Sequence, residues 1–266
     1  EVEAFRTRSL AHTTFPYVFC DATFCKVRVG AHVVSQALVV ATGVSIDGTR
    51  EVLGTAVGDS ESFEFWREFL ASLKARGLSG VHLVISDAHA GLKTAVAQQF
   101  TNSSWQRCRV HFMRNLHTAV AAKHAPAVTA AVKTIFAHTD PAEVGAQWDR
   151  VADTVAASFP KVAAMMAEAK TDVLAFTAFP KAHWQKIWSN NPIERLNKEI
   201  KRRADVVEIF PNPAAFLRLA TAVVIESHDE WQVTRRYLSD VSMDELRAVI
   251  AAKQVAAAVA KQHQIA

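Results

Sequence analysis

The sequence predicts an α/β fold in which helices cover a mixed sheet and an all-helical insertion interrupts it. Three observations support this prediction. Residues 15–57 carry short runs of β-branched and aromatic residues separated by turn residues. Strand-like and amphipathic helical patterns then alternate as far as about residue 124. Residues 125–178 are alanine-rich and helical in pattern, with no strand signal.

The first three strands are expected over residues 15–29, 33–44 and 51–57, because each apolar run ends at a turn signal. Gly30 and Asp47-Gly48 mark the two turns between them. Consecutive strands joined by tight turns pair most simply as an antiparallel meander.

Helices and strands alternate after the meander. Residues 60–76 predict an amphipathic helix, residues 81–85 a buried strand and residues 88–100 a second helix. A fifth strand is predicted over residues 105–110 and a further helix over residues 111–123. This order, βββαβαβα, indicates a mixed sheet with helices on its faces.

The chain divides into four predicted segments. Residues 1–124 form the first part of the core and begin with a polar lead-in. Residues 125–180 form the helical insertion, and residues 181–240 return to the core and contain a long helix from about residue 214 to 237. Residues 241–266 form a helical C-terminal tail.

The remaining core helix, predicted over residues 189–204, is the one around which the chain is organised. Pro192 suits the first helical position, and Asn190 or Asn191 can cap the helix from outside. At about 100° per residue, one face is an apolar stripe and its neighbour is polar and basic. The stripe consists of Ile193, Leu196 and Ile200, and the polar face of Glu194, Asn197, Lys198, Lys201 and, at its edge, Arg202.

Glu194 is the acid that this polar face presents, because Glu199 falls on the far side of the stripe. A single carboxylate in a basic surround suits a site for a phosphate-bearing partner. The alternative is an ordinary Glu194–Lys198 ion pair, which stabilises a solvated helix by only a few tenths of a kcal/mol.

Two aspartates occupy positions typical of a ligand site. Asp21 lies in the middle of the first strand, where aspartate is disfavoured, and Asp87 follows the strand at residues 81–85. If these two strands are neighbours, both carboxylates meet at the edge of the sheet where ligands collect. The alternative is that Asp87 caps the helix beginning near Ala88 and that Asp21 faces solvent.

Carboxylates held close together repel each other and rarely persist without a cation. Mg²⁺ prefers hard oxygen ligands, so Asp21 and Asp87, joined by Glu194 from the later helix, predict a magnesium site in which Mn²⁺ can substitute. Two metals there could activate a water or hydroxyl and stabilise the leaving oxygen of a phosphodiester.

Charge and cysteine content narrow the class of protein. The formal net charge is +4, and cations cluster between Arg195 and Arg203, which favours a polyanionic partner. Three cysteines argue against a disulfide framework and indicate a reducing compartment. No apolar run approaches the roughly 20 residues of a membrane span, so a cytoplasmic protein is expected. The sequence opens at Glu1 without methionine, so an N-terminal part is expected to be missing.

The sequence contains four motifs: CDAT at residues 20–23, SDAHAGL at residues 86–92, WQRCRVH at residues 105–111 and NPIERLN at residues 191–197. In this order they closely resemble the catalytic region of bacterial Mutator-family insertion-sequence transposases. The likeness extends over residues 5–238 and includes the sequence His-Asp-Glu-Trp that ends at Trp231.

The resemblance implies a ribonuclease H-like fold whose D-D-E triad is Asp21, Asp87 and Glu194. It implies DNA as the partner, in the form of the element's terminal inverted repeats and the target DNA, and a homo-oligomer in the synaptic complex. It also implies a bacterial protein that is nucleoid-associated when bound to DNA, with an N-terminal DNA-binding region in complete members. Three residues depart from the usual pattern without removing an acid: Phe24, Asn190 and Glu208.

Cys108 and His111 form a C-x-x-H pair that the family shares. The sequence offers no second Cys/His pair at a spacing suited to structural zinc. One alternative is a role for the pair beside the active site, where it would brace the fifth strand or contact DNA. The other is that the pair is simply packed in the core. His89 is expected either to contact phosphate or orient the metal shell, or to be a surface or helix N-terminal histidine.

The candidates for DNA contact are mostly cations, because Lys and Arg neutralise phosphates, with one aromatic residue that can stack on an unpaired base. The alternatives are solvated helix faces for the cations and core packing for the tryptophan. The candidates are Arg107, Arg109, Arg114, Trp184, Arg195, Asn197, Lys198, Lys201, Arg202 and Arg203.

The sequence therefore predicts the catalytic domain of a metal-dependent DNA transposase, in which water or a 3′-hydroxyl attacks a phosphodiester. Two alternatives remain. One is a truncated, catalytically silent DNA-binding remnant of a transposase. The other is a general ribonuclease H-like nuclease, which the helical insertion and the NPIER motif disfavour.

Overall fold

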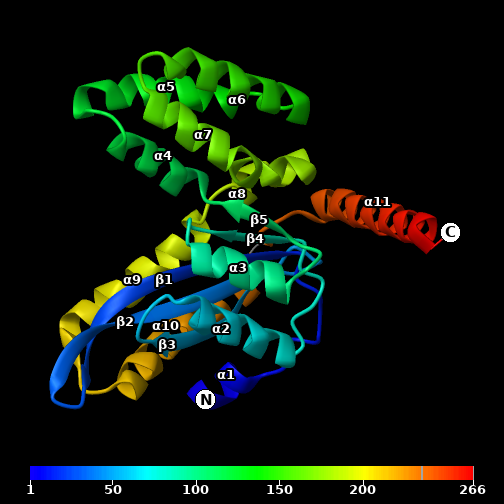
Figure 1. Cartoon of the computed structure of the whole chain (residues 1–266). Helices are drawn as coiled ribbons and strands as arrows, with labels where there is room; N and C mark the ends of the chain where they lie inside the picture. Colours follow the sequence, from blue (N-terminus) through cyan, green and yellow to red (C-terminus); the bar gives the residue numbers. More distant parts are fainter. Residues whose placement is uncertain (235, 266) are drawn as a thin grey trace.

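The computed structural model describes residues 1–234 and 236–265, and it describes side chains for all of these except Pro192 and residues 257–265. The described strands form one sheet: β1 (Tyr17–Val29), β2 (His32–Val44), β3 (Arg50–Gly58), β4 (Leu83–Ser86), β5 (Ser104–Arg107) and β6 (Ile209–Phe210). Their order is β3-β2-β1-β4-β5, with β6 paired to the far end of β1 (Figure 1). The first three strands form the predicted antiparallel meander, whereas β4 pairs in parallel with β1 and with β5. The predicted mixed α/β sheet is therefore confirmed.

The turn between β2 and β3 needs a glycine. Gly48 has a φ of +77°, a conformation that glycine adopts without the steric cost a Cβ would bring. Its carbonyl oxygen accepts a hydrogen bond of 3.0 Å from the backbone N–H of Leu238, and a Cβ at Gly48 would run into the Leu238 carbonyl. The turn thus fastens the C-terminal part of the chain to the sheet.

Helices cover both faces of the sheet: α2 (Phe63–Ala75) and α3 (Ala90–Gln99) on one, α9 (Asn191–Val207) and α10 (Pro213–Val233) on the other (Figure 1). This follows from the alternation of side chains along a strand. Val18 and Cys20 of β1 belong to the apolar cluster that contains α2 and α3, whereas Tyr17 and Phe19 belong to the cluster that contains α9 and α10.

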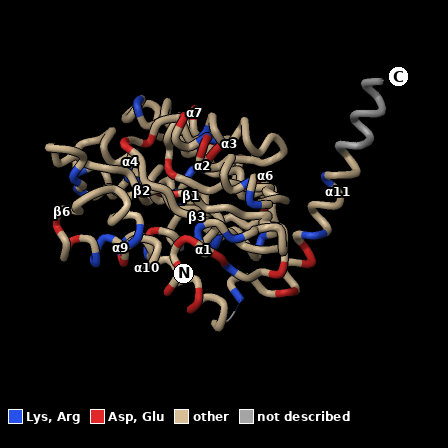
Figure 2. Tube along the Cα trace, turned by 90° about the horizontal axis from the view of Figure 1, so that it is seen from below, with Lys and Arg blue, Asp and Glu red and all other residues tan. Residues whose placement is uncertain are grey.

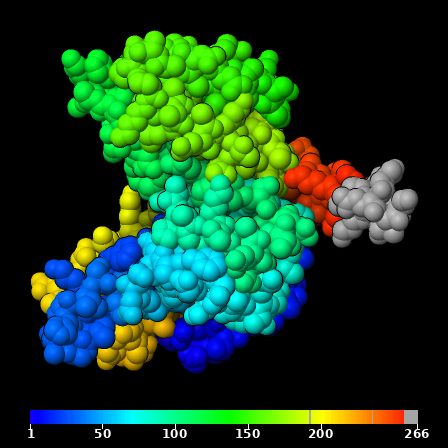
Figure 3. Space-filling model, in the orientation of Figure 1, coloured from blue at the N-terminus to red at the C-terminus, as the bar shows by residue number. Residues whose placement is uncertain are grey.

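A group of helices stands at the end of the sheet, in the upper part of Figure 1: α4 (Arg109–Thr118), α5 (Ala125–Ile135), α6 (Pro141–Ala156), α7 (Pro160–Val173) and α8 (Trp184–Ile187). Within the described chain, no strand lies between α4 and α9. Phe112 of α4 stacks on Trp148 of α6 with ring centroids 5.5 Å apart. One hydrophobic cluster runs from Phe19 in the sheet into these helices, so the two regions share a core although the space-filling view shows a narrower waist between them (Figure 3). The four predicted segments stay a prediction.

Gln106, at the end of the sheet, ties the helical region to β5. Its buried side chain donates a hydrogen bond of 2.8 Å to the Val173 carbonyl and accepts one of 2.7 Å from the Phe176 N–H. Because a buried amide left without partners is costly, these bonds fix where the helical region meets the sheet.

Several predicted boundaries were wrong. β5 ends at Arg107, three residues early, because the Cys108 N–H donates to the Ser86 carbonyl and the chain then turns into α4. α9 continues to Val207 and α10 ends at Val233. The predicted polar lead-in contains the short helix α1 (Val2–Thr7). The C-terminal tail forms the predicted helix, α11 (Asp240–Ile265), which projects from the side of the molecule (Figure 1).

No helix in the described residues combines the length and apolar character needed to cross a bilayer.

His183 lies at the junction between the two regions and is fully buried. Its Nδ1 is 2.7 Å from the Tyr17 hydroxyl of β1, and the two rings meet edge to face. Burial lowers the pKa of His183 from 6.5 to about 4. The folded protein therefore holds this imidazole neutral at a pH where the unfolded chain would protonate it.

This depressed pKa predicts a loss of stability in acid. The contribution of His183 is fully present above pH 6.5 and is lost as the pH falls towards 4, because the unfolded state then binds the extra proton. Between pH 7 and pH 5 it should remove about 2 kcal/mol from the free energy of unfolding. Urea unfolding of wild type and of His183→Gln at both pH values measures this, and the variant should lose less stability than wild type over the interval. An equal loss in both proteins would contradict the assignment.

Candidate active site

The pairing of β1 with β4 brings the two predicted aspartates together. The parallel pairing of β1 with β4 ends with Phe19 opposite Ile85, and Asp21 and Asp87 each stand two residues further along the chain. Both side chains therefore follow the alternation of Phe19 and Ile85, which face α9 and the helical region. The expectation that these strands are neighbours is confirmed.

Asp21 does not face solvent. Asn197 of α9 donates a hydrogen bond of 2.7 Å from Nδ2 to the Asp21 carboxylate. Burial and, to a smaller extent, the neighbouring Asp87 carboxylate raise the pKa of Asp21 to about 7, against the hydrogen bonds from Ala22 and Asn197. A carboxyl group held in this way favours the arrival of a cation, which would restore its charged form.

α9 is placed by its apolar stripe and by Asn190. Ile193, Leu196 and Ile200 are buried against the sheet, as predicted. Asn190 stands at the N-cap, but its side chain makes no capping bond, so the predicted capping role was wrong. Instead its Nδ2 donates to the Cys20 carbonyl at 3.0 Å, while its backbone N–H points at Cys108 Sγ, 3.3 Å away. The start of α9 is thereby fixed beside Asp21.

Glu194 points into the same site. Its side chain is only 18% exposed, and Oε1 is buried without a hydrogen-bond partner in the described residues. Among the described residues, Glu194 makes no ion pair with Lys198. This argues against the alternative of an ordinary Glu194–Lys198 pair on a solvated helix. The nearest group of opposite charge is His111, whose Nδ1 is 3.7 Å from Oε1.

His111 lies among the acids. Its Nδ1 is 2.5 Å from Asp87 Oδ1 and 3.3 Å from the Sγ of Cys108, which is fully buried. The hydrogen bond to Asp87 raises the pKa of His111 to about 10, the Cys108 contact adds to the rise, and burial opposes it. Arg114 Nη1 lies 2.8 Å from Nε2. The C-x-x-H pair is therefore part of this site, and not only core packing.

The residues present fit a hard divalent cation. Glu194 supplies a buried carboxylate oxygen without a partner among the described residues, 3.7 Å from His111 Nδ1, and Asp87 lies 2.5 Å from the same nitrogen and raises the pKa of Asp21. Three carboxylates arranged around one position would suit Mg²⁺ or Mn²⁺. In the described residues, the set with ligand atoms within 4.8 Å of one another is Asp87 with Cys108 and His111, which overlaps the set of three acids. The two sets share Asp87, so a softer metal bound to the second would compete with the first.

His89, and not Asp87, caps α3. The His89 Nδ1 accepts a hydrogen bond of 3.2 Å from the Leu92 N–H. The alternative in which Asp87 is merely a helix cap is therefore wrong. Of the two roles expected for His89, the structure shows that of a histidine at a helix N-terminus.

The proposed base-stacking role of Trp184 is wrong for this structure. Trp184 is only 5% exposed, and its indole N–H donates 2.8 Å to the Phe179 carbonyl. Arg109 is also packed, with its guanidinium 3.9 Å above Trp188 and 4.5 Å above Phe136. Both residues thus stabilise the junction of the two regions. Arg107 is half-buried, with its guanidinium 5.0 Å from the Phe112 ring.

The cations of α9 divide into two groups. Arg202 and Arg203 pair with Glu199, and Arg203 also pairs with Glu226. Arg195, Lys198 and Lys201 are exposed and make no ion pair in the described chain. Lys and Arg positions outnumber the acidic positions with which they are interspersed along this helix (Figure 2). The second group is therefore better placed to meet phosphates than the first.

Sequence reasoning missed the contact roles of Asn197 and Asn190. Asn197 follows Glu194 by three residues, and this spacing puts both on one helix face, so its position beside the acids could have been inferred. Asn190 gave no such signal, because its partners come from distant segments.

The comparisons with known proteins agree over most of the chain. A family model described as "Transposase, Mutator family" matches residues 1–234. The transposase for insertion sequence element IS1081 of Mycobacterium tuberculosis is 47% identical over 249 residues, covering 94% of this chain and 60% of the relative. The transposase for IS256 in transposon Tn4001 of Staphylococcus aureus is 38% identical over 241 residues, covering 90% and 62%. The transposase for ISRM5 of Rhizobium meliloti is 37% identical over 246 residues, covering 92% and 61%. The chain thus spans about 60% of the length of these relatives.

The anchoring role of Asn190 can be tested through stability. Asn190→Ala keeps the backbone bond to Cys108 but leaves the buried Cys20 carbonyl without its side-chain donor, so the free energy of unfolding should fall by about 1–3 kcal/mol. Urea unfolding measures this loss. The matched control is Asn102→Ala in an exposed turn, which should change stability by less than about 0.5 kcal/mol. Equal midpoints for wild type and Asn190→Ala would contradict the anchoring role.

Proposed function

Since the chain belongs to the Mutator family of transposases, we propose that it is the catalytic region of a DNA transposase that cuts and joins phosphodiester bonds at the ends of an insertion sequence. The observation that carries the proposal is the meeting of Asp21, Asp87 and Glu194, delivered by β1, the end of β4 and α9. Nothing in the folding of a sheet requires three carboxylates at one place. Three carboxylates held together repel one another, and a bound cation would offset this repulsion.

We further propose that the sheet is a ribonuclease H-like one and that the three acids form a D-D-E triad. The triad would hold Mg²⁺, or Mn²⁺ in its place. When bound, such ions activate a water or a 3′-hydroxyl and stabilise the leaving oxygen of the phosphodiester. The unpartnered Oε1 of Glu194 and the carboxylate pair of Asp21 and Asp87 support this assignment.

The chain's own residues then position the reacting groups. Asn197 orients the Asp21 carboxylate, and Asn190 fixes the α9 turn that carries Glu194. His111 holds Asp87 through its Nδ1. Arg195, Lys198 and Lys201 offer charges to DNA phosphates on the exposed side of the same helix. The nucleophile is water or a freed DNA end, so no covalent bond to the protein forms.

The partners of this activity would be the terminal inverted repeats and the target DNA. A homo-oligomer in the synaptic complex is expected because two element ends must be brought together. Among the described residues, the side chains of Phe24 in β1 and Lys198 in α9 are exposed. The surface around them is therefore accessible to DNA or to a second copy of the chain.

The experiment is metal-dependent nicking of a labelled duplex that carries the element's own end, with Mg²⁺ and with EDTA. Asp21→Asn, Asp87→Asn and Glu194→Gln should each lower the rate by about a thousandfold, because metal-ion stabilisation is worth several kcal/mol and each 1.4 kcal/mol is tenfold. Affinity for the duplex should change little.

The matched control is Glu64→Gln, an exposed carboxylate on the opposite face of the sheet in α2, which should cut at the wild-type rate. A wild-type rate in any of the three acid variants would remove that residue from the mechanism. Duplex that is bound but never cut, with every metal tried, would make the chain a silent DNA-binding remnant.

A further inference from the structure

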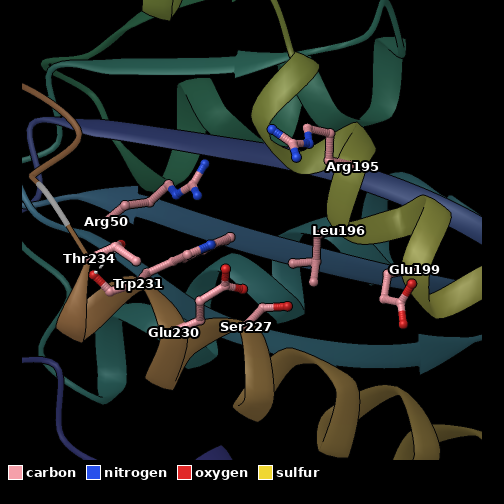
Figure 4. A pocket seen from close by; sticks show the side chains of 8 residues that line it. All are labelled: Arg50, Arg195, Leu196, Glu199, Ser227, Glu230, Trp231 and Thr234. Atoms are coloured by element: carbon pink, nitrogen blue, oxygen red, sulfur yellow. Dashed lines mark hydrogen bonds between the residues drawn. The ribbon is translucent and has the colours of Figure 1, made fainter.

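A pocket of about 400 Å³ lies between α9 and α10 (Figure 4). Arg195 and Glu199 line it from α9, Ser227, Glu230 and Trp231 from α10, and Arg50 from the start of β3. None of the proposed chemical steps uses this pocket. The His-Asp-Glu-Trp sequence singled out above supplies Glu230 and Trp231 to its wall.

Arg50 packs against aromatic rings, and its side chain meets no hydrogen-bond acceptor in the part of the chain that the structure describes. Its guanidinium carbon lies 3.6 Å from the centre of the Trp231 ring and 5.1 Å from that of Tyr237. Its Nε is buried without a hydrogen-bond partner, and its side chain makes no ion pair in the described residues. Aromatic contacts of this kind hold the guanidinium plane but leave its N–H edge available for an anion.

Arg195 faces Arg50 across the pocket (Figure 4). Burial and, to a smaller extent, Arg195 lower the pKa of Arg50, while Tyr237 and Glu230 raise it. Two guanidinium groups repel each other when they share a pocket, and an anion between them removes that repulsion. A phosphodiester is a fitting anion, because guanidinium donors match its oxygens in pairs.

The pocket also contains two carboxylates, which limit the anions it can take. Glu199 is already paired with Arg202 and Arg203, so its charge is met on the outer side of α9. Glu230 makes no ion pair in the described chain and reduces the positive potential near Arg50. The pocket therefore favours an anion held by direct hydrogen bonds over one attracted only by net charge.

We propose that this pocket binds a backbone phosphodiester of the DNA, with Arg50 and Arg195 as donors and Trp231 as the residue that positions Arg50. The inference rests on the proposed function. Arg195 follows Glu194 directly in α9 and points to a neighbouring face of the helix, so the phosphate held here is a different one from the phosphate that would react at the acids. Free phosphate carries the same kind of anionic oxygens as a DNA phosphodiester, so it is the other source of such an anion.

The test is fluorescence anisotropy of a labelled duplex in EDTA, where nothing is cut, at several salt concentrations. Arg50→Ala and Arg195→Ala should each weaken binding by about tenfold at 0.1 M salt and reduce the slope of log affinity against log salt by about 1. Trp231→Leu should weaken binding with a wild-type slope, because the charge of Arg50 remains. Arg50→Lys should behave likewise, since it keeps the charge and loses the planar fork.

The matched control is Arg218→Ala, an exposed arginine on the same helix α10 and outside the pocket, which should bind as wild type does. Arg195 is exposed and already offers its charge to DNA under the proposed function, so the Arg50 variants report on the pocket, and Arg50→Lys keeps the test open if Arg50→Ala does not fold. Wild-type affinity in Arg50→Lys, or an equal loss in Arg218→Ala, would overturn the inference.

A third measurement distinguishes free phosphate from DNA phosphate as the bound anion. It also distinguishes a failure of the pocket assignment from a failure of the proposed function. If inorganic phosphate raises the melting temperature of wild type but not of Arg50→Lys, and the DNA slopes are unchanged, the pocket serves free phosphate and the inference is wrong. If wild type itself does not bind duplex DNA, the proposed function fails first. If wild type binds and the Arg50 variants match it while Arg195→Ala binds more weakly, only the pocket assignment fails.

Discussion

The parallel pairing of β1 with β4 is the constraint on which the rest of the site depends. It sets Asp21 and Asp87 at equivalent positions on neighbouring strands, and the alternation of side chains turns both towards the same face. Two carboxylates so placed repel each other, and burial of Asp21 increases the cost. Asn197 reduces the cost with a hydrogen bond to Asp21, and His111 reduces it with an ion pair to Asp87. The surrounding structure therefore stabilises an arrangement that a cation would complete.

The same constraint explains why distant segments converge. Asn190 and Cys108 join the start of α9 to β1 and to the turn after β5, so Glu194 arrives at the acids only when the helical region is folded against the sheet. Tyr17 with His183 and Gln106 with Val173 hold that junction from within. The stability of the junction and the position of Glu194 are thus coupled, because the contacts that fasten the two regions also place this acid.

Much of this arrangement follows from local sequence pattern. Strand and helix periodicity predicted the sheet, the stripe of α9 and the face that carries Glu194, and turn residues predicted the meander. Roles that depend on long-range contacts did not follow. The sequence suggested a cap for Asn190, whose side chain instead bonds to Cys20, and it left base stacking and core packing open for Trp184, which packs against Phe176. The Arg50 pocket joins segments far apart in the chain. Periodicity reports which face a residue occupies, not which distant group it meets.

Asp21, Asp87 and Glu194, from three elements, are proposed to form one site for a hard divalent cation. Diffraction from crystals soaked in Mn²⁺, at a wavelength where manganese scatters anomalously, tests this proposal. We expect an anomalous peak among the carboxylate oxygens of these three residues, which should vanish in Glu194→Gln or move away from that residue. A peak held instead by Cys108 and His111, or no peak near the acids at saturating Mn²⁺, would contradict it.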